Sequence, residues 1–80
     1  MKIPEIKKLV LNYSLDLLDE AEISIINEET PKIEIGGEDD GEQLTHIIAA
    51  KFIIEDMQNT GSDFKTALRK YTEKVRNSIS

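Results

Sequence analysis

The sequence predicts an all-α protein: a small helical bundle of three main helices plus a short N-terminal helix, assembled as a homo-oligomer. Two observations predict the helices. Apolar residues recur three and four positions apart along much of the chain, and capping residues stand where these runs begin. A third observation predicts the oligomer, because one run is more apolar than so short a chain can cover. Eighty residues are expected to form a single small helical domain, 1–80.

The first two helices are predicted from their starting residues and from their apolar spacing. Pro4 suits the first turn of a helix over 4–11, where its missing N–H costs nothing. Ser14 is a good N-cap for a second helix, predicted over about 15–28. The apolar positions of this second helix fall within roughly half a turn of the helical wheel: Leu15, Leu17, Leu18, Ala21, Ile25 and Ile26.

Residues 22–35 leave an alternative open, either the end of this helix or a β-hairpin. The segments "EISIIN" and "KIEI" are rich in β-branched residues and could be two strands joined by "EETP". One continuous helical stripe favours the helix instead. Pro31 then ends it, since proline disfavours helix at the residue before it. Residues 32–35 are expected to be extended and could pair with the same segment of another chain.

The acidic run "GGEDDGEQ" is interpreted as the start of a third helix, predicted over about 40–58. Asp39 as N-cap, with Glu42 three residues later, has the spacing of a capping box. Negative charge in the first turn also suits the helix dipole. Gly61 is the expected break at the other end. The acids Glu38, Asp39 and Asp40 therefore have a structural explanation as a solvated capping segment.

Ser62 is the predicted cap of a fourth helix over about 63–78. Its apolar stripe is narrow and clean: Phe64, Ala67, Leu68, Tyr71, Val75 and Ile79. Basic side chains occupy the rest of its surface: Lys65, Arg69, Lys70, Lys74 and Arg76. A solvated basic face is the usual meaning of this pattern. A nucleic-acid accessory role through this helix is therefore only the third hypothesis for the function, behind the two that are given below.

The third helix carries the prediction of assembly, because it is apolar almost all round. Its apolar residues cover most of the wheel: Leu44, Ile47, Ile48, Phe52, Ile53, Ile54 and Met57. Only a narrow polar stripe remains: Lys51, Glu55 and Gln58. Such a helix must be covered on several sides. The sequence therefore predicts an obligate homo-oligomer, with a dimer favoured, in which a second copy supplies the missing cover.

The charge is uneven along the chain. The net charge of -6 combines about +2 over residues 1–13, -10 over 16–42, -1 over 43–59 and +3 over 60–80. An acidic centre between basic ends suggests complementarity within or between chains. It argues against nucleic acid as the main ligand, which needs a dominant basic face. Apolar burial is expected to dominate assembly, so the oligomer should survive high salt.

The sequence offers no clear site for chemistry. The chain has no cysteine and one histidine, and no nucleophile or phosphate-binding motif occurs. An EF-hand aligned on Gly41 fails, because Ile47 would stand at its last ligand position. Glu42 and His46 lie one helical turn apart and could share a metal ion, which makes a metal-binding or small-ligand protein the runner-up. His46 is expected to be buried or in an interface. No catalytic residue, cofactor or metal site is predicted, and the protein is not expected to be an enzyme.

The segments "GEQLTHIIAAKFIIEDM" and "DFKTALRKYTEKVRNSI" resemble a small, uncharacterised family of bacterial proteins of about this length. The resemblance implies a short cytoplasmic α-helical protein and transfers no activity or site residue. No apolar run is long enough for a signal peptide or a membrane span, which also predicts a cytoplasmic location. The expected function is that of a small, acidic, oligomeric adaptor or regulatory protein.

Overall fold

A computed structural model describes residues 2–79, which form four helices and no strand. These are α1 (Ile3–Asn12), α2 (Leu15–Ile26), α3 (Asp40–Thr60) and α4 (Phe64–Ile79). The prediction of an all-α protein with a short N-terminal helix is confirmed. The hairpin alternative is wrong, because residues 22–26 belong to α2 and residues 27–39 form an irregular loop. The helical stripe outweighed the β-branched composition.

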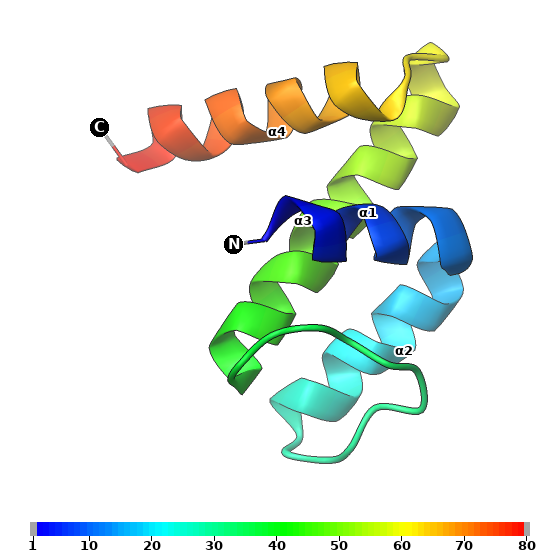
Figure 1. Cartoon of the computed structure of the whole chain (residues 1–80), viewed down its shortest axis with the longest axis vertical. Coiled ribbons are helices and arrows are strands. Elements are labelled where there is room, and N and C mark those ends of the chain that lie inside the picture. The colour runs from blue at the N-terminus through cyan, green and yellow to red at the C-terminus, as the bar shows by residue number, and fades with distance from the viewer. Residues whose placement is uncertain (1, 80) are drawn as a thin grey trace.

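The third helix, α3, is the centre of the molecule. It contacts each of the other three helices, which surround it at different levels (Figure 1). In that view α1 crosses in front of α3, α2 descends beside it, and α4 runs across the end where α3 finishes. The four helices pack compactly, with principal extents of 32 × 29 × 19 Å.

The core is built around α3 and draws on every helix. Its fully or nearly buried apolar residues come from α1, α2, α3, the loop and α4: Ile6, Leu9, Leu18, Ala21, Ile25, Ile35, Ile47, Ala49, Ala50, Ile53, Ile54, Ala67 and Tyr71. Ala49 and Ala50 of α3 are fully buried, and their small side chains let neighbouring helices approach closely. One chain thus covers most of α3, although Leu44, Phe52 and Met57 are only partly buried. That a second copy supplies the remaining cover stays a prediction. Among the large apolar side chains of α3, only Ile48 is exposed.

Several predicted helix ends are confirmed in atomic detail. The hydroxyl of Ser14 accepts a hydrogen bond from the N–H of Leu17, at 3.3 Å. The carboxylate of Asp39 accepts one from the N–H of Glu42, at 2.7 Å. Gly61 ends α3 in the left-handed conformation, with φ of 73°. These residues predict helix ends well because each of them satisfies a backbone group that the helix leaves unpaired.

Two predicted boundaries are wrong. The cap of α4 is Asp63 and not Ser62, since the Asp63 carboxylate accepts the N–H of Thr66 at 2.9 Å. Ser62 instead donates its hydroxyl hydrogen to the carboxylate of Asp56, at 2.9 Å. Helix α2 ends at Ile26 rather than at residue 28.

The earlier end of α2 has a physical cause. Glu28 adopts φ of 61°, which turns the chain out of the helix before Pro31 is reached. The N–H of Glu28 donates to the carbonyl of Ile25 at 3.0 Å, and that of Glu29 to the carbonyl of Ser24 at 2.7 Å. These two bonds satisfy carbonyls that the helix leaves free. A glutamate takes the place in which glycine is usual.

Helix α4 is covered along only part of its length. Ala67 and Tyr71 are buried, as the predicted stripe requires, whereas Val75 is 36% exposed. The second half of the helix extends beyond the body of the molecule toward the C-terminus (Figure 1). The side chain of Ile79, the last member of the predicted stripe, lies outside the described residues.

Candidate functional site

The histidine that sequence analysis singled out is a fully buried structural residue. His46 lies on α3, and its Nε2 accepts a hydrogen bond from the backbone N–H of Lys2, at 2.9 Å. Its Nδ1 lies 2.7 Å from the carbonyl oxygen of Gly36, to which it can only donate. The ring is therefore neutral, with its hydrogen on Nδ1. One imidazole thus joins α3 to the start of α1 and to the long loop.

Glu42, the other residue of the metal hypothesis, serves the same junction. Its Oε1 accepts the N–H of Glu38 at 2.9 Å and lies 3.9 Å from the Nζ of Lys2. The capping box is therefore one residue longer than predicted, because Glu42 reaches back to Glu38 and not to Asp39. Both nitrogens of His46 are committed to backbone groups, so neither has a lone pair to offer a metal ion in this arrangement. Among residues 2–79, no group of three or more His, Asp or Glu side chains could hold one.

A second polar cluster joins α2 to α3. The Nζ of Lys51 contacts the carboxylate of Asp19 and lies 2.7 Å from that of Glu22. These hydrogen bonds, to Asp19 first and Glu22 second, raise the pKa of Lys51 above its ordinary value of 10.5. The helical wheel placed Lys51 in a narrow polar stripe and did not predict this cluster. Its only sequence signal is a lysine in an apolar helix of a chain that is rich in acids.

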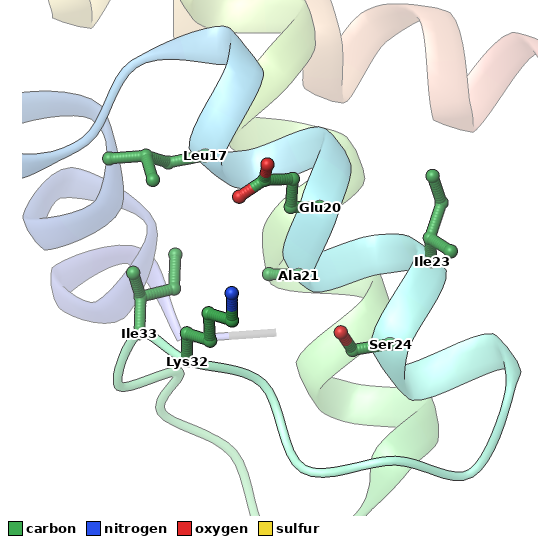
Figure 2. Close-up of a pocket in the computed structure, with 7 residues that line it drawn as sticks. All are labelled: Leu17, Glu20, Ala21, Ile23, Ser24, Lys32 and Ile33. Carbon is green, nitrogen blue, oxygen red and sulfur yellow. The ribbon is translucent and has the colours of Figure 1, made fainter.

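A shallow groove lies between α2 and the loop, with a volume of about 240 Å³. We call it the α2 groove, lined by Leu17, Glu20, Ala21, Ile23, Ser24, Lys32 and Ile33. Figure 2 shows Lys32 and Ile33 directed from the loop toward α2. Its floor is apolar, and Glu20 and Lys32 supply one charge of each sign. It lacks a buried nucleophile or a pair of carboxylates, so its chemistry is that of weak binding.

Contacts on both sides of α3 locate its one large exposed apolar side chain, Ile48. Phe52 packs against Tyr71 of α4, with ring centroids 5.4 Å apart, and Lys51 contacts α2. Ile48 lies one helical turn before both Phe52 and Lys51, so it occupies the α3 surface between α2 and α4. Ile48 is 46% exposed there.

Two more exposed apolar side chains lie on the helices that flank Ile48. Ile26 lies one turn after Glu22 on α2 and is 62% exposed. Val75 lies one turn after Tyr71 on α4. We call Ile26, Ile48, Phe52 and Val75 together the apolar strip. Sequence analysis placed each of them on an apolar stripe, but not together on one surface that the chain leaves uncovered.

The cations of α4 are divided between two sides of the helix. Lys70 lies 3.4 Å from the carboxylate of Asp56, and the Nζ of Lys74 lies 5.0 Å from the centre of the Phe52 ring. These two lysines therefore border the apolar strip. Lys65 and Arg69 lie on the other side of α4 and are exposed. The five basic side chains that the sequence pattern suggested on one face therefore do not form a single continuous basic surface.

None of the described helices combines the length and apolar content that crossing a membrane requires.

Comparison with known proteins identifies the family but no activity. The model of a family of unknown function (DUF6952) matches residues 1–80, and the chain belongs to this family. The resemblance noted from its two longest motifs is thereby confirmed as membership of a family without an assigned function. No curated protein and no solved structure matches this chain.

Proposed function

We propose that the protein is a small, acidic, non-enzymatic interaction protein, an adaptor or regulatory subunit, which acts as a homodimer. The apolar strip is the observation that carries this proposal. Ile26, Ile48 and Val75 belong to three different helices, and all three side chains are exposed. Full burial of one such side chain contributes roughly 1.5–3 kcal/mol. Because these side chains are already partly buried within one chain, a partner that covered the strip would gain only part of this free energy for each of them.

The arrangement of His46 supports a non-enzymatic role. A general base or a metal ligand needs a lone pair that a substrate or an ion can reach. The lone pair of Nε2 is instead taken up by the N–H of Lys2, and the imidazole itself is fully buried. The residue that offers the most chemistry in the sequence thus holds the N-terminus and the loop in place.

The dimer proposed from the structure differs from the obligate oligomer expected from the sequence. Because the core of α3 is covered within one chain, dissociation and unfolding become separable events. A charge at Ile47, which is fully buried, would unfold the chain whether or not it dimerises. A charge at the half-exposed Ile48 keeps access to water, so it tests the interface alone.

The experiment is light scattering at micromolar concentration on the wild-type chain, Ile48→Glu and Leu11→Glu. Leu11 is the matched control, since it is 66% exposed on α1, outside the strip. We expect the wild type and Leu11→Glu to have the mass of two chains, and Ile48→Glu that of one. Circular dichroism should show the same helix content in all three. A wild-type chain with the mass of one chain would refute the dimer.

A second candidate function is the binding of a small apolar ligand in the α2 groove. The observation that favours it is the apolar floor formed by Leu17, Ala21 and Ile33, beside the charges of Glu20 and Lys32. A fluorescent apolar probe such as anilinonaphthalene sulfonate would test it. Binding that Ser24→Trp abolishes, and that Leu11→Glu leaves intact, would support this role, because Ser24 lines the groove without being part of the buried core.

The nucleic-acid role through α4 is kept as a third candidate, which a salt-dependent gel shift tests. A shift lost in Lys65→Glu would support it.

A further inference from the structure

The apolar strip divides the surface into an acidic and a basic flank. Helix α2, on one side of Ile48, carries four acids and no base, so its charge is about -4. Helix α4, on the other side, carries five bases and one acid, and two of these bases, Lys70 and Lys74, border the strip. Two members of the strip, Ile48 and Phe52, belong to α3 and lie between these two helices. The surface therefore has opposite charge on the two sides of Ile48.

This pattern is self-complementary in one orientation only. A two-fold axis that lies in an interface brings the same surface of two copies together. If the axis is parallel to α3, the acidic flank of each copy faces the basic flank of the other. If it is perpendicular to α3, acid faces acid and base faces base, and like charges across an interface are costly.

We propose that two copies of this chain meet through the apolar strip about a two-fold axis parallel to α3, so that α2 of one copy faces α4 of the other. This inference rests on the proposed homodimer and specifies its interface. Ile48 then lies beside the axis and meets its own counterpart. Helix α2 of one copy then covers the half of α4 that the single chain leaves exposed.

The heights of the charged residues along α3 agree with this orientation. Lys51 forms ion pairs with Asp19 and Glu22, so these two acids lie at about the same height along α3 as Lys51. Phe52, the next residue, marks the level of Lys74 on the basic flank. An axis parallel to α3 preserves height, so the carboxylates of one copy meet Lys74 of the other at nearly the same level. Complementary charge of this kind orients an encounter more than it stabilises the complex.

The opposite side of α3 is not available to a partner. His46 lies two residues before Ile48, which places it about half a turn away on the helix. It is fully buried beneath the start of α1, to which its Nε2 is hydrogen-bonded. Among the described helices, α1 therefore covers the far side of α3. Leu11 of α1 is exposed but lies outside the strip.

The absence of cysteine from the sequence makes disulfide trapping a clean test. Residues can be bridged when their Cα atoms approach within about 7 Å. Ile48→Cys and Leu11→Cys are each oxidised under identical conditions at micromolar concentration, and the products are separated on a non-reducing gel. We expect at least a tenfold larger dimer fraction for Ile48→Cys than for Leu11→Cys. Circular dichroism confirms that both variants are folded, which their exposed positions favour.

Mixing two single-cysteine variants tests the orientation. Ile26→Cys and Val75→Cys are oxidised separately and together, with one of them carrying a fusion tag so that the mixed product is distinct. We expect the mixed dimer to exceed either self-linked dimer. A predominant Ile26 self-linked dimer would mean that α2 meets α2, and would overturn the proposed axis. Lys74→Glu should also raise Kd several-fold at low salt, and less at high salt.

Light scattering separates failure of this inference from failure of the homodimer itself. If the wild type has the mass of two chains but Ile48→Cys links no better than Leu11→Cys, the interface is wrong and the dimer remains. If the wild type has the mass of one chain, both the dimer and its interface are refuted.

Discussion

His46 and Gly36 are joined by a 2.7 Å hydrogen bond, in which Nδ1–H of the imidazole donates to the carbonyl oxygen of Gly36. The same ring accepts the N–H of Lys2 on its other nitrogen. A buried side chain on the central helix thus supplies the partners of two backbone groups far from it in sequence. The long loop and the N-terminus are placed by this one residue more than by any local preference of their own.

His46→Phe should therefore destabilise the protein by about 1–3 kcal/mol, although phenylalanine has nearly the same shape. The substitution leaves the carbonyl of Gly36 and the N–H of Lys2 without their partner, and unpaired polar groups of this kind carry that cost. Urea unfolding followed by circular dichroism measures it. Thr45→Ala is the control, because Thr45 is exposed and only donates to its own helix, so a change within about 0.5 kcal/mol is expected. Equal effects of the two substitutions would contradict the structural role of His46.

Gly61→Ala should destabilise the protein by about 1 kcal/mol through the backbone alone. Gly61 has φ of 73°, and an added Cβ would meet nothing within 4 Å, so no clash contributes. Gly41→Ala is a matched control with the opposite expected sign. Gly41 lies in the first turn of α3, where an added Cβ meets only an ordinary contact with Asp39 at 3.4 Å. Thermal unfolding of both variants should move in opposite directions.

Glu28→Gly should stabilise the protein by about 0.5–1 kcal/mol. Glu28 is the only non-glycine residue with positive φ among those described, at 61°, and glycine adopts this conformation without strain. The gain is set against the greater freedom of glycine in the unfolded chain, which limits its size. Glu29→Gly, at the neighbouring position, has only this second effect and should destabilise. A loss of stability in Glu28→Gly would show that the turn after α2 is not left-handed.

These turns and caps also show how far the sequence alone reaches. Ser14, Asp39 and Gly61 were predicted because each satisfies backbone groups within a few residues of itself. Ser62 and Asp63 are both good cap residues in adjacent positions, and the choice between them depends on Asp56, which engages Ser62. That contact spans six residues and an intervening helix end, so local rules could not decide it.

The partners of His46 and the apolar strip were beyond prediction for a related reason. Burial of His46 follows from its place on an apolar helix, but its bond to Lys2 joins residues 44 positions apart. Ile48 was assigned to a helix that is apolar on every side, and nothing in the wheel shows which side remains open. Only the placement of α1, α2 and α4 around α3 leaves Ile48 exposed.

Asp63→Ala should destabilise the protein more than Ser62→Ala, because Asp63 is the residue that caps α4. Hydrogen bonds from Thr66, of its side chain first and its backbone second, lower the pKa of Asp63 below the ordinary 3.8. A carboxyl group whose pKa is lowered by folding stabilises the protein at pH values above its ordinary pKa. This stabilisation is lost as the pH falls through the lower pKa of the folded protein. The difference between wild type and Asp63→Ala should therefore close in strong acid. Urea unfolding at neutral and acid pH measures it, and a larger effect of Ser62→Ala would reverse the assignment.

Lys51→Met should destabilise the protein at neutral pH, by no more than about 1 kcal/mol because the ion pairs of Lys51 are near the surface. Hydrogen bonds to Asp19 and Glu22 raise the pKa of Lys51 above 10.5. An amino group whose pKa is raised by folding stabilises the protein fully at pH values below its pKa in the unfolded chain, near 10.5. This stabilisation is lost as the pH rises through the higher pKa of the folded protein. Burial raises the pKa of Tyr71 as well, but that loss occurs in both proteins and cancels in their difference. The difference in unfolding free energy between wild type and Lys51→Met should thus be constant around neutrality and shrink at strongly alkaline pH, as urea unfolding at a series of pH values would show. A difference that stayed constant at alkaline pH would mean that the charge of Lys51 does not bind α2 to α3.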